Sequence, residues 1–273
     1  METARIIWRG VRRPLRFLLL LYVVLAVAAP WLAPRMMFHP ELASRAATEG
    51  MRLLKTPAGE SVAVLHLPNP AARFTLWVFH GNAESLADLE PWQHELHAAG
   101  FAVFAADYPG YGRSTGEPSE GSVNASTRLA RDFLRRELGV PAERTILYGR
   151  SLGGGPAVQA ATEERVGGLV LQSAFMSVHR VLTRWSLLPF DQFRNLAKIP
   201  GVACPVLVMH GGRDEVIAFA HGEALFAAAP EPKQKLWVPA AHHNDFVRVA
   251  GGDYWRALRE FNALCASGAP AQL

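Results

Sequence analysis

Cysteine is scarce in this chain. Its 273 residues include only Cys204 and Cys265. Two cysteines this far apart do not make a disulfide framework, and neither has the sequence context of a catalytic cysteine. Cys204 precedes an apolar run and Cys265 lies in a helical stretch, so both are interpreted as structural. No cysteine lies near the N-terminus to carry a lipid.

A net positive charge is missing from most of the chain. Five arginines and one acid, Glu2, lie in residues 1–16 and account for the whole formal net charge of +4. Residues 17–273 are therefore neutral overall. A nucleic-acid-binding protein carries a basic patch on its folded body. We therefore expect no nucleic-acid partner.

One long apolar run follows the arginines. Residues 17–33 contain no charged side chain, and about 17 residues is the shortest helix that spans a bilayer. The arginines before the run predict a single-pass anchor, with residues 1–16 cytoplasmic and the body on the non-cytoplasmic side. The alternative is a signal peptide cleaved near Ala26–Ala28, which would give a secreted protein. The one-sided charge disfavours a third interpretation, a buried core helix.

The rest of the chain has the composition of one globular domain. Half of all residues are apolar and 19% are charged, which excludes a disordered chain. Residues 34–50 are interpreted as a connector, 51–266 as the domain and 267–273 as a tail.

Apolar strand runs alternate with helical stretches along the domain, which predicts a mostly parallel sheet with helices on both faces. The expected strands are Met51–Lys55, Val62–Leu67, Phe74–Phe79, Phe101–Ala106, Thr145–Tyr148, Gly168–Gln172, Val206–His210 and Lys235–Val238. The expected helices are Leu86–Ala99, Ser122–Leu138, Leu152–Thr162, Ala218–Ala228 and Asp253–Ala266.

Ser151 lies between a predicted strand and a predicted helix, within the pattern Gly149-Arg150-Ser151-Leu152-Gly153. This is the G-x-S-x-G nucleophile elbow, in which the serine adopts a strained backbone conformation and a Cβ at either glycine would crowd the strand or the helix. A helix beginning behind Ser151 would direct the Leu152 N–H toward a developing oxyanion.

Other polar residues also follow the predicted strands. Asn82, Ser151, Asp214 and His243 all come after a strand run, at the sheet edge where ligands bind in such folds. The chain order serine, aspartate, histidine is the order that this architecture uses.

These motifs resemble the α/β-hydrolase superfamily over about residues 50–266. More narrowly, the chain is similar to a membrane-anchored group that includes lysophospholipases and protein depalmitoylases. An apolar anchor ending near MMFHP (Met36–Pro40) is also usual for that group. The stretches that carry the resemblance are VFHGNAESL (Val78–Leu86), DYPGYGRS (Asp107–Ser114), YGRSLGGGPA (Tyr148–Ala157), CPVLVMHGGRDEVIAFAHG (Cys204–Gly222) and HNDF (His243–Phe246).

The resemblance implies a catalytic triad. Ser151 would be the nucleophile and His243 its base, while Asp214 would orient the imidazole. Where the group has glycine, this chain has His242, which is therefore an alternative base. Glu215 is the alternative to Asp214 as the carboxylate that orients the imidazole. We interpret Asp245 as a capping or solvated residue, although His242, His243 and Asp245 together also allow a metal-site interpretation.

The expected oxyanion hole consists of the backbone N–H groups of Asn82 and Leu152, with Ala83 as the alternative to Asn82. His80 and His210 are interpreted as loop-shaping residues. The sequence allows two interpretations of Arg150, a substrate contact or a structural salt bridge. An apolar cap over about residues 174–203 is expected to accept an acyl chain.

The sequence thus predicts a serine hydrolase of carboxylic esters or thioesters, of fatty-acyl or lysophospholipid type, that needs no cofactor and no metal. Its partners would be a small acyl substrate and, through residues 17–33, a membrane. One alternative is a catalytically silent, membrane-tethered binding module, whose mark would be a broken triad. Another is cofactor-free peroxidation on the same triad; a peptidase of this fold would need a larger chain.

Overall fold

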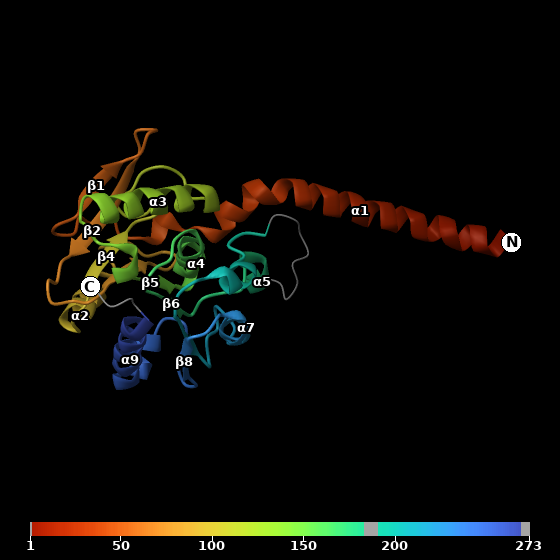
Figure 1. Ribbon diagram of the computed structural model, residues 1–273. Helices are drawn as coiled ribbons and strands as arrows, with labels where there is room; N and C mark the ends of the chain where they lie inside the picture. The colour runs from red at the N-terminus through yellow and green to blue at the C-terminus, as the bar shows by residue number, and fades with distance from the viewer. Residues whose placement is uncertain (1, 183–190, 269–273) are drawn as a thin grey trace.

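The computed structural model describes the backbone of residues 2–182 and 191–268. Within these ranges it leaves the side chains of residues 2–11, 13, 29–34, 182 and 268 undescribed. The body is built around one eight-stranded sheet in the order β1-β2-β4-β3-β5-β6-β7-β8 (Figure 1). The strands are β1 (Arg52–Lys55), β2 (Ser61–Leu67), β3 (Thr75–Phe79), β4 (Ala102–Ala106), β5 (Thr145–Arg150), β6 (Gly168–Gln172), β7 (Val206–Gly211) and β8 (Lys233–Val238).

The sheet is mostly parallel, as predicted. Strands β3 to β8 run parallel, whereas β2 pairs antiparallel with both β1 and β4. Parallel strands bring their carboxyl ends to one edge of the sheet, so the residues that follow β3, β5, β7 and β8 come close together there.

Helices cover both faces of the sheet, because the central strands are apolar on both sides. Trp77 and Phe79 of β3 pack toward one core and Leu76 and Val78 toward the other. On the first face lie α3 (Glu120–Arg136), α4 (Gly154–Glu163), α6 (Asn195–Lys198) and α7 (Ala220–Ala228). On the second lie α2 (Glu90–Ala98), α8 (Phe246–Ala250) and α9 (Gly252–Gly268). The short 3₁₀ turns are η1 (Pro40–Leu42), η2 (Ala142–Arg144), η3 (Ser151–Gly153) and η4 (Ile199–Gly201).

Helix α1 (Glu2–Met37) projects from the body as a long rod (Figure 1). It takes in the first four residues of the predicted connector, since Arg35, Met36 and Met37 are good helix formers. It ends before His39, whose backbone is restricted by Pro40.

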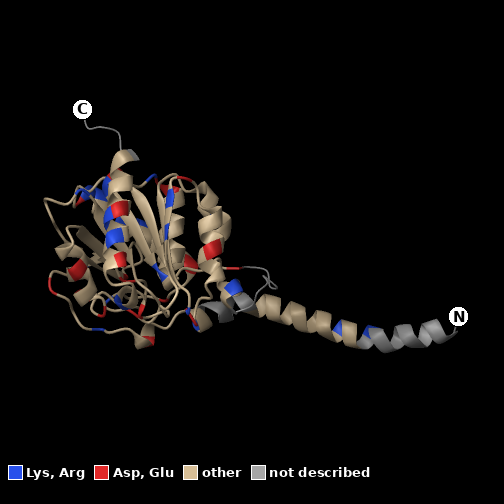
Figure 2. Cartoon of the chain, turned by 90° about the horizontal axis from the view of Figure 1, so that it is seen from below, with Lys and Arg blue, Asp and Glu red and all other residues tan. Residues whose placement is uncertain are grey.

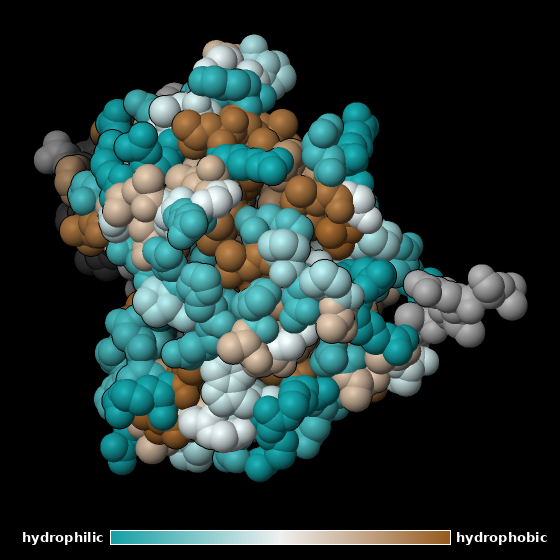
Figure 3. Space-filling view, turned by 90° about the vertical axis from the view of Figure 1, so that its left-hand side faces the viewer, coloured by the Kyte–Doolittle hydropathy of each residue, from teal (hydrophilic) through white to brown (hydrophobic). Residues whose placement is uncertain are grey.

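The described part of α1 is apolar and uncovered. Between Arg16 and Arg35 the helix carries no charged residue (Figure 2). Its aliphatic side chains are exposed to solvent, from Leu15 at 62% to Val27 at 58%. By contrast, the face of the body opposite α1 shows apolar patches interspersed with hydrophilic side chains (Figure 3).

Within the described residues, no helix meets the combined requirement of length and apolarity for crossing a bilayer. The predicted anchor includes residues 29–33, whose side chains lie outside the described set. The anchor over 17–33 therefore stays a prediction.

The predicted cap is described only in part. Helix α5 (Val178–Leu182) precedes residues 183–190, which lie outside the described residues, and α6 and η4 follow them. Trp185, Leu187, Leu188, Pro189 and Phe190, which the sequence assigned to the acyl pocket, fall in that range.

Candidate active site

Ser151 lies at the sharp turn between β5 and α4, with its backbone in the left-handed region at φ +52°. The turn leaves no room for side chains at the flanking glycines. A Cβ on Gly149 would come within 2.7 Å of the Gly153 oxygen, and one on Gly153 within 2.1 Å of the Phe79 oxygen. The spacing of the motif is therefore a steric requirement of the turn.

The structure brings Ser151, His243 and Asp214 together as the sequence predicted. His243 Nε2 lies 3.0 Å from Ser151 Oγ, and His243 Nδ1 lies 2.8 Å from Asp214 Oδ2. The imidazole and the carboxylate are buried, whereas Ser151 is half-buried. The three residues come from the ends of β5, β7 and β8, so the parallel sheet itself sets their spacing.

The carboxylate of Asp214 is held in its ionised form. Burial alone would raise its pKa, but hydrogen bonds from His210, from His243 and from the Ile217 N–H outweigh burial and hold the pKa well below its ordinary value. His210 Nε2 lies 3.4 Å from Asp214 Oδ2, a contact that sequence reasoning missed. A carboxylate fixed in this way can orient the imidazole and stabilise its protonated form.

We expect Asp214→Asn to lower stability in a pH-dependent way. In the unfolded chain the Asp214 carboxyl titrates near its ordinary pKa of 3.8 and in the folded protein it titrates lower. Its stabilising contribution is therefore complete above that value and is lost as the pH falls through the folded pKa. Urea unfolding should show the largest gap between wild type and variant near pH 7 and a smaller gap below about pH 4. A gap that widens on acidification would contradict this assignment.

The rival residues point elsewhere. His242 Nδ1 lies 3.0 Å from Glu215 Oε2, in a pair that is about half exposed. Asp245 accepts a hydrogen bond from the His242 N–H at 2.7 Å. The rival base and the rival acid therefore contact each other, and neither is hydrogen-bonded to Ser151. Within the described part of the chain, no three His, Cys, Asp or Glu side chains are grouped to hold a metal ion.

The residues predicted for the oxyanion hole come from two segments beside Ser151: Asn82 from the loop after β3, and Leu152 from the turn after β5. Leu152 begins the turn into α4, and Asn82 follows Gly81, whose position is only 3.7 Å from Ser151 Cβ when a Cβ is built on it. The Ala83 N–H donates to the Asn82 Oδ1 at 3.1 Å. Ala83 is thus already engaged, which favours Asn82 as the second donor.

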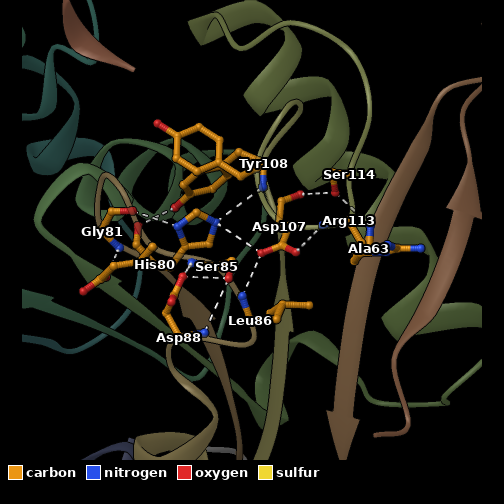
Figure 4. Close-up of polar contacts among 12 residues, drawn as sticks. Ala63, His80, Gly81, Ser85, Leu86, Asp88, Asp107, Tyr108, Arg113 and Ser114 are labelled. Atoms are coloured by element: carbon orange, nitrogen blue, oxygen red, sulfur yellow. Dashed lines mark hydrogen bonds and ion pairs between the residues drawn. The ribbon is translucent and has the colours of Figure 1, made fainter. Parts of the chain in front are cut away.

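His80 and Asp107 form a buried support beneath this loop (Figure 4). Burial lowers the pKa of His80 to about 4, and the neutral ring hydrogen-bonds the Gly81 carbonyl through Nδ1 at 2.8 Å. Asp107 accepts the Leu86 N–H at 2.8 Å, and burial raises its pKa to about 7. The Tyr108 hydroxyl donates to the His80 carbonyl at 2.9 Å. His80 is therefore a loop-shaping residue, as the sequence suggested.

Comparison with known proteins is decisive for the family. Residues 70–200 match the family model described as serine aminopeptidase, S33. The chain is 36% identical to the human alpha/beta hydrolase domain-containing protein 17B over 214 residues, which cover 77% of this chain and 73% of that protein. The chain belongs to the α/β-hydrolase superfamily. Membership supports a hydrolase activity for this chain.

Two further comparisons, one of sequence and one of fold, agree with this membership of the α/β-hydrolases. It is 41% identical to the Caenorhabditis elegans protein aho-3 over 227 residues, which cover 80% of this chain but only 66% of that protein. It shares its fold with an esterase from Pyrococcus furiosus, with a TM-score of 0.66 at 17% identity over 78% of this chain and 91% of that one.

An ion pair joins the loops around the site of this α/β-hydrolase, and it involves Arg150, whose role the sequence left open. Arg150 pairs with Glu84, and Glu84 Oε2 accepts the Gly81 N–H at 2.8 Å. Arg150 also reaches Asn244 Oδ1 at 3.4 Å. Arg150 is thus a salt-bridge residue that ties the serine, oxyanion and histidine loops together.

A cavity of about 530 Å³ lies beside Arg150, between α2, α8 and α9. Its walls include Leu89, Trp92, Val247 and Trp255. A smaller cavity of about 220 Å³ lies in the cap region and is lined partly by Arg180, Asp191 and Arg194. The larger cavity was not predicted, because its walls come from segments far apart in the sequence.

The two cysteines are buried on opposite faces of the sheet, away from the site. Burial raises the pKa of the Cys204 thiol to about 12, and that of Cys265 is also raised by burial. Neither thiol is a nucleophile at neutral pH.

Proposed function

We propose that this protein is a serine hydrolase that cleaves carboxylic esters or thioesters through an acyl-enzyme on Ser151. The observation that carries the proposal is the continuous hydrogen-bonded chain from Ser151 Oγ through His243 to Asp214. It lies at the carboxyl edge of a parallel sheet, in a strained elbow. A structural serine would not need the histidine.

In the proposed reaction, Ser151 Oγ attacks the acyl carbon while His243 Nε2 takes its proton. The carbonyl oxygen becomes an oxyanion, which the N–H groups of Asn82 and Leu152 would stabilise. Protonated His243 then gives its proton to the departing alcohol or thiol as that bond breaks, which leaves the acyl group on Ser151. Water, deprotonated by His243, attacks the acyl-enzyme and releases the acid.

The substrate class rests on the surroundings of Ser151. The 530 Å³ cavity is lined by four apolar side chains, two of them tryptophans, and by polar side chains that include Glu95 and Arg248. It adjoins Arg150, directly before the nucleophile. A cavity of this size accepts an apolar chain of moderate length. We therefore propose a fatty-acyl ester, thioester or lysophospholipid, with an apolar group of the substrate seated against Trp92 and Trp255.

A fluorophosphonate probe tests the proposal, because it labels only serines activated by a base. Full-length wild type should be labelled, whereas His243→Ala should not be. A panel of matched acyl esters and thioesters of increasing chain length then identifies the preferred substrate. A folded wild type that resists labelling would favour the silent binding module instead.

We also propose that α1 attaches the protein to a membrane, with residues 1–16 cytoplasmic and the hydrolase body on the other side. Support comes from the uncovered aliphatic side chains of Leu15 to Val27 and from the arginines that precede them. The protein should then remain in the membrane fraction after alkaline carbonate extraction, with its N-terminus intact. A soluble mature form beginning near Ala29 would instead indicate a cleaved signal peptide.

A further inference from the structure

The end of α1 is hydrogen-bonded directly to the oxyanion loop. Asn82 Nδ2 donates to the carbonyl of Met37, the last residue of the helix, at 2.7 Å. In return, the His39 N–H lies 3.0 Å from Asn82 Oδ1 and 2.9 Å from the Tyr111 hydroxyl. The Asn82 amide thus joins two segments that lie 43 residues or more apart in the sequence.

Both the amide nitrogen and the amide oxygen of the Asn82 side chain have specific partners. Its Oδ1 also accepts the Tyr111 hydroxyl at 2.5 Å and the Ala83 N–H at 3.1 Å. Ala83 itself is held in the left-handed region, at φ +61°. A side chain held by several donors and by an acceptor cannot rotate freely, and through its Cα it restrains the position of the Asn82 backbone.

A second contact joins the same segment to the other side of the site. Phe38 is 3% exposed and packs edge-on against both Tyr111 and Phe193. Phe193 in turn lies against Gly155 in the first turn of α4, where a Cβ would come within 2.4 Å of its ring. Phe38 therefore lies between Tyr111, which is hydrogen-bonded to Asn82, and Phe193, which packs on the helix that begins behind Ser151.

We infer that Met37–His39 is a positioning element for the oxyanion hole and acts through the side chains of Asn82, Tyr111 and Phe38. The inference rests on the proposed function, because it assumes that the Asn82 N–H is an oxyanion donor. The inference further implies that the rate of the chemical step depends on the position of the end of α1. A displacement of a membrane-attached α1 would then be transmitted to the loop that carries Asn82.

The physical reason lies in the geometry of oxyanion stabilisation. A backbone N–H stabilises the transition state only when it points at the position of the oxyanion, and complete loss of one donor costs about 10²- to 10³-fold in kcat. A displaced donor should cost less, about 10- to 100-fold. Ground-state binding does not use this hydrogen bond fully, so KM should change little.

The experiment compares full-length variants in detergent with an oxygen ester and with its thiono counterpart, in which sulfur replaces the carbonyl oxygen. Asn82→Ala, Tyr111→Phe and Phe38→Ala each remove one part of the contact, and Asn82→Asp keeps the shape of the side chain but loses the donor to Met37. The control is Thr145→Val, which removes a buried hydroxyl that accepts from Arg135 and donates to the Pro141 carbonyl, at the end of β5 opposite to Ser151.

We expect kcat on the oxygen ester to fall about 10- to 100-fold in Asn82→Ala and less in Tyr111→Phe and Phe38→Ala, with KM within about twofold. The preference for oxygen over sulfur should shrink in the same order, because sulfur is the poorer hydrogen-bond acceptor. Thr145→Val should lower the melting temperature without changing this preference.

Two results would overturn the inference alone. One is a wild type that reacts with fluorophosphonate together with variants that keep both its kcat and its preference for the oxygen ester. The other is a loss of kcat that follows the melting temperature across all variants, the control included. A folded wild type that does not react would overturn the proposed function, and the inference with it.

Discussion

Replacing Ser151 with alanine is expected to lower kcat for ester hydrolysis by about 10⁵- to 10⁶-fold and to leave the fold intact. The expected loss is large because Ser151, His243 and Asp214 form one hydrogen-bonded unit, and a base without its nucleophile contributes nothing. Removing a single Oγ at a half-buried position leaves no cavity of consequence. Steady-state kinetics on the preferred ester, with circular dichroism for the fold, measures both effects.

A second serine provides the matched control. Ser173 follows β6 and, like Ser151, has a backbone in the left-handed region, at φ +49°. Its hydroxyl is buried without a hydrogen-bond partner, and no described histidine is bonded to it. Ser173→Ala should therefore keep wild-type activity. His243→Ala should be as inactive as Ser151→Ala, and the double variant no worse than either. Turnover by purified Ser151→Ala would refute the acyl-enzyme mechanism.

Gly153→Ala is expected to destabilise the protein severely and to abolish activity. The new methyl group would lie 2.1 Å from the Phe79 carbonyl oxygen and 2.7 Å from that of His80, both backbone atoms of the loop that carries Asn82. Overpacking of a core side chain costs about 1–3 kcal/mol, and backbone atoms yield less readily, so we expect about 3 kcal/mol or more. Urea unfolding measures the loss.

The control for that variant is Gly201→Ala. Gly201 lies in η4 and a Cβ there would contact nothing within 4 Å, so alanine should change the free energy of unfolding by less than about 0.5 kcal/mol. If Gly153→Ala lowers the free energy of unfolding no more than Gly201→Ala does, then the crowding at Gly153 relaxes easily. In that case, the turn would not depend on close approach of β3 and the elbow.

Much of the fold could be predicted because the central strands are buried on both faces. Continuous apolar runs such as Gly168–Gln172 leave little choice of structure, and the observed β6 has these same bounds. The edge strand β8 begins two residues earlier than predicted, at Lys233. The two added residues, Lys233 and Gln234, are polar and partly exposed, so they do not continue the apolar pattern.

Helix starts were less predictable where tertiary contacts compete with the helix. The sequence predicts a helix from Leu86, but α2 begins at Glu90. The Leu86 N–H donates to the Asp107 carboxylate, and Pro91 is placed in the first helical turn, where its missing N–H costs nothing. The hydrogen bond between Leu86 and Asp107 joins residues 21 positions apart, so no local sequence pattern predicts it.

The same distinction holds at the site. Chain order and strand ends, together with the family resemblance that selects His243 over His242, were enough to predict that Ser151, Asp214 and His243 meet. The contacts that hold the site were not predictable. Glu84 on Arg150 and Met37 on Asn82 join segments far apart in the sequence. His210 is only four positions from Asp214, but it reaches the carboxylate only because of the turn that follows β7. Side-chain chemistry identifies which residues can react, whereas only the folded backbone shows what holds them in place.

The strained backbone of Ser151 has an evolutionary consequence. A residue with a Cβ in the left-handed region costs about 1–3 kcal/mol, and glycine would relieve much of that cost. A descendant that exchanged this serine for glycine would therefore gain thermal robustness in the same step that ended its chemistry. Selection for robustness alone favours the silent descendant. Persistence of the serine in a lineage is thus a sign that selection still acts on turnover.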